Sequence, residues 1–282
     1  MVQDPVVSAV WLAAEFDEPD LRVVDATWFM PGDARVGREA YRQGHIPGAV
    51  FFDIDAISDP DTDLPHMLPN PHALAEALGD LGLTRDHRVV VYDGQGIFSA
   101  PRVWWTLRIA GFERVYVLDG GLKAWVAQGG AVEAGEPAIS PARVEPSFDS
   151  DLVRNLDEVR AIVAGSGYEQ LVDARAVPRF RGEAPEPREG LRSGHMPGAC
   201  NVPWQTLLTQ DGRMRDKDAL RAAFEAAGVD FKRPIVTTCG SGVSAAVLAL
   251  ALARVGMDRV PVYDGSWTEW GGLVDTPVAT GG

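Results

Sequence analysis

The chain has 282 residues, enough for two domains of ordinary size, and its 46% hydrophobic and 23% charged content is typical of a globular protein. The net charge of −14 argues against nucleic acid or an anionic membrane as a partner. Two cysteines are too few for a disulfide framework, and no Cys/His cluster has metal-ligand spacing. We therefore expect no metal, no cofactor and a reducing, cytoplasmic location. The start of the chain lacks the basic segment of a signal peptide, and no apolar run reaches transmembrane length.

Taken in chain order, the predicted elements repeat. Each half has apolar strands ending in Asp-Ala or at a Gly-rich loop, a GH-x-PGA turn, and helical segments between them. The matching segments are 21–26 and 170–174, 44–49 and 194–199, 74–83 and 220–229, 89–93 and 235–239, and 116–125 and 262–270. Strands that alternate with helices predict an α/β fold of two tandem domains, each a largely parallel sheet flanked by helices.

The boundary between the halves is predicted from composition. Residues 129–150 are rich in Pro, Gly and charge and lack a sustained helical or strand period. We expect a first domain over residues 1–140, a linker over 141–150 and a second domain over 151–282.

The stretch 234–247, PIVTTCGSGVSAAV, carries the strongest chemical signal. Its β-branched residues 235–238 predict a buried strand, and the apolar run after Ser244 predicts a buried helix. Cys239 is thus expected where a strand ends, on a Gly-rich loop whose amides favour a thiolate. A buried, inert cysteine is the alternative. The Gly-x-Gly context favours a nucleophile.

The duplication provides an internal control. The GH-x-PG turn occurs in both halves, so His45 and His195 are predicted to serve the fold. At the loop the halves differ, because Asp93 stands where the second half has Cys239. A carboxylate cannot act as a sulfur nucleophile, so we expect the first domain to be inactive.

Several motifs together resemble those of the rhodanese-type sulfurtransferases, and among them the two-domain 3-mercaptopyruvate sulfurtransferases. The resemblance covers nearly the whole chain. It rests on CGSGVSA (239–245), the two GH-x-PGA turns, FFDID (51–55), HMLP (66–69), SAPRVWW (99–105), PEPREG (185–190) and YDGSWTEW (263–270).

This resemblance implies that the Cys239 thiolate takes sulfur from 3-mercaptopyruvate, releases pyruvate and holds a persulfide. A thiol, thioredoxin or cyanide then accepts the sulfur, so two half-reactions are expected. The loop amides of Gly240, Gly242, Val243 and Ser244 are expected to cradle the persulfide.

The resemblance also assigns residues to the donor. The family's substrate arginines fall on Arg179 and Arg188, whose planar guanidinium groups suit a carboxylate and a ketone. Without the resemblance, arginines in a long loop are more often solvated charges; Arg181 is a competitor for one role, and Arg175 is expected to pair with a carboxylate of the scaffold.

A proton relay is the last implied feature. Ser241, His66 and Asp55 match a Ser–His–Asp relay proposed for the family, which would deliver a proton to the pyruvate enolate. A histidine among prolines, as in DLPHMLPNP, is otherwise usually a loop residue.

Three other functions are alternatives to this one. Thiosulfate sulfurtransferases resemble one another in having basic residues directly after the cysteine, whereas Gly240 and Ser241 are uncharged here, although some thiosulfate turnover is compatible. A Cys-dependent phosphatase needs an arginine in a C-x5-R loop, and this loop has none. A non-enzymatic sulfur carrier or docking module remains open, since a fold alone does not specify function.

Overall fold

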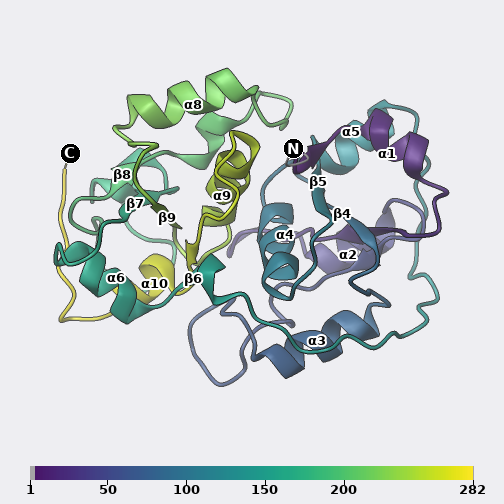
Figure 1. Cartoon of the computed structure of the whole chain (residues 1–282), viewed down its shortest axis with the longest axis horizontal. Helices are drawn as coiled ribbons and strands as arrows, with labels where there is room; N and C mark the ends of the chain where they lie inside the picture. The colour runs from purple at the N-terminus through teal and green to yellow at the C-terminus, as the bar shows by residue number, and fades with distance from the viewer. Residues whose placement is uncertain (1–3, 282) are drawn as a thin grey trace. The chain divides into compact units, whose positions relative to one another are not determined.

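The computed structural model describes residues 4–281, and within it the chain divides into two compact units (Figure 1). The first unit consists of residues up to Pro60, Leu68–Asp149 and Leu208–Met214. The second consists of Asp61–Met67, Ser150–Leu207 and the chain from Arg215 onward. The division does not follow the sequence strictly. Residues 61–67 group with the second unit, and residues 208–214 group with the first.

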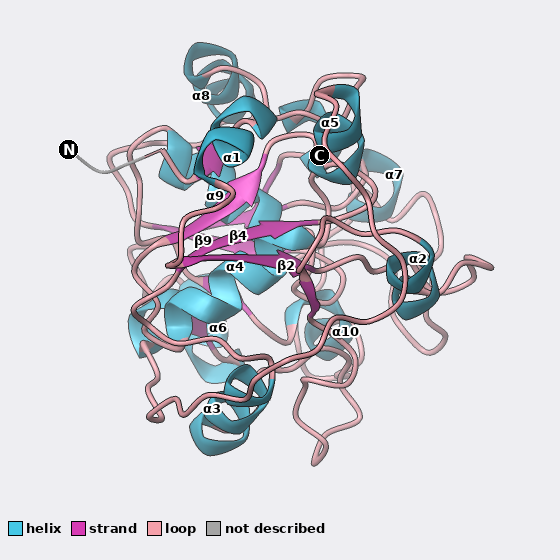
Figure 2. Ribbon diagram, turned by 90° about the vertical axis from the view of Figure 1, so that its right-hand side faces the viewer, coloured by secondary structure: helices cyan, strands magenta, loops and turns pink. Residues whose placement is uncertain are grey.

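The first unit contains a parallel five-stranded sheet in the order β1-β5-β4-β2-β3. Strands β2 and β4, which pair along five residues each, lie side by side in Figure 2. The strands are β1 (Val6–Val7), β2 (Leu21–Asp25), β3 (Val50–Phe51), β4 (Arg88–Tyr92) and β5 (Val115–Leu118). The helices are α1 (Ala9–Glu15), α2 (Gly37–Gln43), α3 (Pro71–Asp80), α4 (Ala100–Ile109) and α5 (Gly121–Ala127).

The second unit repeats this topology, because its parallel strands follow the order β6-β10-β9-β7-β8. The strands are β6 (Val153–Arg154), β7 (Gln170–Asp173), β8 (Cys200–Asn201), β9 (Ile235–Thr238) and β10 (Val262–Tyr263). The helices are α6 (Leu156–Val163), α7 (Val177–Phe180), α8 (Lys217–Ala226), α9 (Ala245–Arg254) and α10 (Ser266–Trp270), with 3₁₀ turns at Ser150–Leu152 and Trp204–Leu207. The predicted fold class, two tandem parallel α/β domains, is confirmed.

The central strands form where the sequence has runs of β-branched residues, which suit strands buried on both faces. All residues of β9 are buried, and so is every residue of α9 except Arg254. Helix α4 is buried along nearly its whole length and packs on β4 and β5, as α9 packs on β9 and β10. The loops that follow β4 and β9 are therefore held between two buried elements at the carboxyl edge of each sheet, where parallel α/β folds place their ligand sites.

The exposed helices begin at side chains that accept backbone N–H groups. Asn70 begins α3 in this way and Asp216 begins α8. Asn155 and Glu158 form a complete capping box at the start of α6. Within residues 4–281, no helix combines the length and the apolar character needed to cross a bilayer.

The GH-x-PG histidines have structural partners, in agreement with the prediction from the duplication. His45 is fully buried, lies 2.9 Å from the Tyr41 carbonyl through Nδ1 and stacks on the Tyr41 ring. His195 lies 2.8 Å from the Phe180 carbonyl through Nδ1 and stacks on the Phe180 ring. Each ring thus fastens a turn to the helix before it.

Candidate active site

The loop between β9 and α9 carries Cys239 directly after the last strand residue. Only 2% of Cys239 is exposed. Gly242, at the turn of the loop, has φ of +77°, a conformation that favours glycine. The strand, the glycine turn and the buried helix that the sequence predicted around Cys239 are therefore present.

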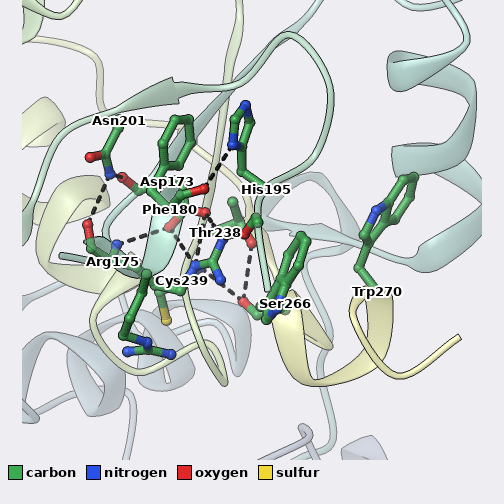
Figure 3. A network of polar contacts seen from close by, with 12 residues as sticks. Asp173, Arg175, Phe180, His195, Asn201, Thr238, Cys239, Ser266 and Trp270 are labelled. Atoms are coloured by element: carbon green, nitrogen blue, oxygen red, sulfur yellow. Dashed lines mark hydrogen bonds and ion pairs between the residues drawn. The ribbon is translucent and has the colours of Figure 1, made fainter. Parts of the chain in front are cut away.

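Helix α10 fixes the backbone of this loop (Figure 3). The Cys239 N–H donates to Ser266 Oγ at 3.2 Å, and the Trp267 N–H donates to the Cys239 carbonyl at 3.0 Å. The next carbonyl, that of Gly240, accepts from the Thr268 N–H at 2.8 Å and from Thr268 Oγ1 at 2.6 Å. Both backbone groups of the cysteine and the carbonyl after it are thus held by one helix N-terminus.

Ser266 holds this arrangement in an uncommon conformation. It is fully buried with φ of +49°, in the left-handed region. Its hydroxyl donates to the Tyr263 carbonyl at 2.8 Å while accepting the Cys239 N–H. Strain of this kind persists where surrounding contacts hold it, and it gathers at functional sites.

Arg179 borders the loop. A methyl group placed on Gly240 would lie 3.1 Å from Arg179 Nη2. The same guanidinium is ion-paired with Glu186, which accepts from Arg179 Nε at 3.3 Å and from Nη2 at a shorter distance. Arg179 remains 22% exposed, whereas the Glu186 side chain is 1% exposed. The structure therefore brings one of the two predicted substrate arginines next to the cysteine loop, already paired with a carboxylate.

Arg175 is a scaffold residue, as predicted. Its side chain is fully buried, with Asp173 accepting from Nε and Nη2 at 2.7–3.2 Å and Glu186 accepting from Nη1 at 2.8 Å. The guanidinium also lies 4.2 Å from the ring centroid of Trp267. Although burial opposes the charge, the two carboxylates outweigh it and the pKa of Arg175 is raised.

Arg188, the second predicted substrate arginine, contacts His66. Both belong to the second unit, and Arg188 Nη2 donates to His66 Nε2 at 3.4 Å. Because a guanidinium has only donors, the Nε2 atom of His66 acts as the acceptor in this contact. His66 is 6% exposed and has φ of +64°, unusual for a residue other than glycine.

The other two members of the predicted relay are found as follows. Ser241 is 7% exposed in the loop after Cys239, in the same unit as His66. Asp55 belongs to the first unit, where its Oδ2 accepts from Trp28 Nε1 at 3.0 Å. The relay as a whole stays a prediction.

The loop after β4 has a different occupant. Asp93 is fully buried, and its Oδ2 accepts N–H groups from Phe98 at 2.8 Å, Ser99 at 3.0 Å and Ala100 at 3.0 Å. Its Oδ1 accepts the Gln95 N–H at 2.9 Å. A carboxylate at the start of α4 is stabilised by the helix dipole as well as by these amides. The anion-binding positions of the first loop are thus filled by the protein's own side chain.

With this geometry in view, comparisons with known proteins identify the family. The rhodanese-like domain model matches twice, over residues 8–128 and 155–273. The chain belongs to the rhodanese family. The matched ranges carry Asp93 in the first rhodanese-like domain and Cys239 in the second.

Individual relatives cover nearly the whole chain. A 3-mercaptopyruvate sulfurtransferase of Escherichia coli K12 is 44% identical over 274 residues, which span 96% of both chains. The mitochondrial thiosulfate/3-mercaptopyruvate sulfurtransferase 1 of Arabidopsis thaliana is 42% identical over 296 residues, covering 98% of this chain and 78% of the relative. The crystal structure of SseA from E. coli, described as a 3-mercaptopyruvate sulfotransferase with the rhodanese fold, matches with a TM-score of 0.86 and 41% identity, covering 94% of this chain and 99% of SseA.

Two further residues of the site are not predicted by the sequence. Glu186 stands within PEPREG, and its pairing with two arginines depends on how that loop folds. Ser266 stands within YDGSWTEW. Ser266 aligns with Gly121 of the first domain, and both residues have positive φ. A serine in place of a glycine at this position is the difference in sequence that indicates a special role for Ser266.

Proposed function

We propose that this chain is a 3-mercaptopyruvate sulfurtransferase in which Cys239 carries the sulfur. The observation that supports it most directly is Cys239 on a glycine loop beside Arg179, in a chain 44% identical to an E. coli protein of that name over almost its full length. Backbone N–H groups gathered on a glycine loop that leads into a helix suit an anionic sulfur.

In the first half-reaction, the Cys239 thiolate attacks the sulfur of 3-mercaptopyruvate. The new S–S bond forms as the S–C bond of the donor breaks, and the electron pair leaves on carbon as the pyruvate enolate. The proton of the donor thiol is transferred to that carbon, so pyruvate and an anionic persulfide result without net proton uptake. We assign the transfer to Ser241 and His66, and Asp55 is the third member of the proposed relay.

The donor is held by the two arginines. Arg188 binds the carboxylate, and Arg179, beside Gly240, faces the ketone oxygen on which charge develops. The loop amides from Gly240 to Ser244, through Gly242 and Val243, hold the persulfide. In the second half-reaction a thiol, thioredoxin or cyanide removes the outer sulfur and regenerates the thiolate.

We assign no sulfur carrier to the first domain, residues 1–140, which joins the catalytic domain, 151–282, through the linker 141–150. The support is Asp93, whose carboxylate occupies the amides of the corresponding loop. Because the cycle needs a reduced cysteine and a thiol acceptor, the cytoplasm or another reducing compartment suits it.

Thiosulfate sulfurtransferase activity is the second candidate, since the A. thaliana relative is named for both donors. The same persulfide would form, with sulfite leaving. Gly240 and Ser241 place no charge beside the thiolate, which favours the monoanionic donor over the dianion.

The test is to incubate the purified chain with each donor in turn. We expect pyruvate release and the mass gain of one sulfur atom per chain with mercaptopyruvate, and reversal of the mass gain by cyanide or thioredoxin. No mass gain with either donor would refute the proposal, whereas a gain with thiosulfate alone would select the second candidate.

A further inference from the structure

The buried carboxylate of Glu186 pairs with Arg179, the arginine that borders the cysteine loop. Its Oε2 pairs with Arg179 Nη2, and the same nitrogen lies close to Gly240. Glu186 lies outside the loop and is therefore no part of the sulfur-binding amides. It nevertheless offsets the charge of Arg179, which borders the loop.

Among the ion pairs around Glu186, the negative charge of Glu186 balances mainly the positive charge of Arg179. Arg175 is already matched by Asp173, which accepts from two of its nitrogens. The four side chains Asp173, Arg175, Arg179 and Glu186 sum to zero, with one carboxylate for each guanidinium. The loop of Cys239 is therefore bordered by an arginine whose positive charge is offset by Glu186.

Glu186 also selects which edge of Arg179 is available. Its oxygens take the Nε–Nη2 side of the guanidinium. What is left to a donor is Nη1 and the second N–H of Nη2, the nitrogen that lies close to Gly240. A guanidinium held this way presents hydrogen bonds with a fixed direction and reduced net charge.

We propose that Glu186 is a specificity-determining residue that favours a monoanionic α-keto thiol over a dianionic donor such as thiosulfate. This inference rests on the proposed function. An offset Arg179 still donates hydrogen bonds to a ketone oxygen, but it attracts the second charge of a dianion only weakly. The remaining positive groups of the described site are Arg188, in contact with His66, and Arg175, which Asp173 matches.

The size of the effect follows from Coulomb's law. Removing the Glu186 charge exposes about one additional unit of positive charge beside the cysteine loop, in surroundings between protein and water. The preference for thiosulfate relative to mercaptopyruvate, measured as the ratio of kcat/KM, should therefore rise on the order of tenfold.

The experiment compares Glu186→Gln with Glu189→Gln, which removes the same charge from an exposed residue of the same loop. We expect Glu186→Gln to raise the thiosulfate/mercaptopyruvate ratio and Glu186→Asp, which keeps the charge, to restore most of the wild-type ratio. A ratio within twofold of wild type in folded Glu186→Gln, or an equal rise in Glu189→Gln, would overturn the proposal.

A second readout does not depend on sulfur transfer. Cys239 of the persulfide-free protein is alkylated with iodoacetate, which is anionic, and with iodoacetamide, which is neutral; peptide mass spectrometry separates Cys239 from Cys200. We expect the iodoacetate/iodoacetamide rate ratio to rise in Glu186→Gln and to fall in Arg179→Met. Unchanged ratios in both variants would refute the inference even if neither donor is turned over, and the Arg179→Met arm decides alone if Glu186→Gln fails to fold.

Discussion

The loops after β4 and β9 occupy equivalent places in two sheets of identical topology, yet they are built for different ends. In the first, the Asp93 carboxylate accepts four backbone N–H groups and is fully buried. In the second, Cys239 stands at the equivalent position, and its backbone is held by α10. The comparison teaches that this fold gathers backbone N–H groups at the strand end in both halves. The halves differ in whether a side chain of the protein itself accepts hydrogen bonds from these groups.

The helices that support the two loops, α5 and α10, also differ between the halves. The Leu122 N–H donates to the Asp93 carbonyl at 3.1 Å, as the Trp267 N–H donates to the Cys239 carbonyl. At the preceding position the first unit has Gly121, where an added Cβ would lie 2.1 Å from the Asp93 carbonyl oxygen. The second unit keeps a strained serine, Ser266, whose hydroxyl takes the Cys239 N–H. The half to which we assign the chemistry therefore has the more strained backbone at this position.

The largest expected effect comes from removing the nucleophile itself. Cys239→Ser should abolish persulfide formation and turnover, because an alcohol is not ionised at neutral pH and does not accept sulfur. Cys200→Ser should keep nearly full activity, since burial raises the pKa of the Cys200 thiol and leaves it mostly protonated. Steady-state rates with mercaptopyruvate check both. Full activity in Cys239→Ser would falsify the mechanism.

The next largest effect is expected from replacing the carboxylate of the first loop. Asp93→Cys should remove four hydrogen bonds to a buried carboxylate and lower the free energy of unfolding by about 3 kcal/mol or more. It should not add a second persulfide, because this loop is a residue longer than the second and lacks its Gly-x-Gly-Val-Ser path. Urea denaturation measures the first outcome and mass spectrometry the second.

A stoichiometry of two sulfurs per chain in Asp93→Cys would show that both loops are equally prepared for sulfur. The difference between the halves would then reduce to the one side chain. Asp93→Asn is the matched control, since it keeps the shape and removes only the charge.

The sequence predicted the duplicated fold, the central strands and the setting of Cys239, because these depend on local patterns: β-branched runs, a glycine turn and an apolar helix. It also predicted that Arg175 pairs with a scaffold carboxylate. It did not predict that Glu186 would join Arg175 to Arg179, because that pairing is set by the path of a loop without periodicity. Nor did it indicate that the Asp93 side chain turns back onto its own loop, since side-chain direction is decided by packing.

A smaller effect is expected from removing the substrate arginines of the second half, compared with an arginine of the first half. Arg188→Ala should raise the KM for mercaptopyruvate about tenfold or more, because a charge-assisted contact to the carboxylate is worth roughly 1.5–3 kcal/mol. Arg179→Ala should act similarly. Arg35 provides the control, as it lies in the corresponding stretch of the first unit and pairs with Asp33 at 2.7 Å.

Arg35→Ala should leave the KM unchanged. Steady-state kinetics at several mercaptopyruvate concentrations separate KM from kcat in all three variants. An unchanged KM in both Arg188→Ala and Arg179→Ala would transfer the carboxylate to another group, with Arg181 as the candidate.

The smallest effect tests the strained serine against the glycine of the other half. Ser266→Gly relieves the left-handed conformation, worth about 1–2 kcal/mol for an L-residue, but leaves the buried Cys239 N–H without its acceptor, which costs about 1–3 kcal/mol. The two terms oppose each other, so the stability of Ser266→Gly should stay within about 1 kcal/mol of wild type. Ser266→Ala keeps the strain and loses the hydroxyl, so it should be the less stable variant. Thermal and urea unfolding of the pair decide the order, and greater stability of the alanine variant would show that the φ of +49° at Ser266 carries no strain. In both variants the rate of persulfide formation should fall only a few-fold, because Trp267 still holds the Cys239 carbonyl.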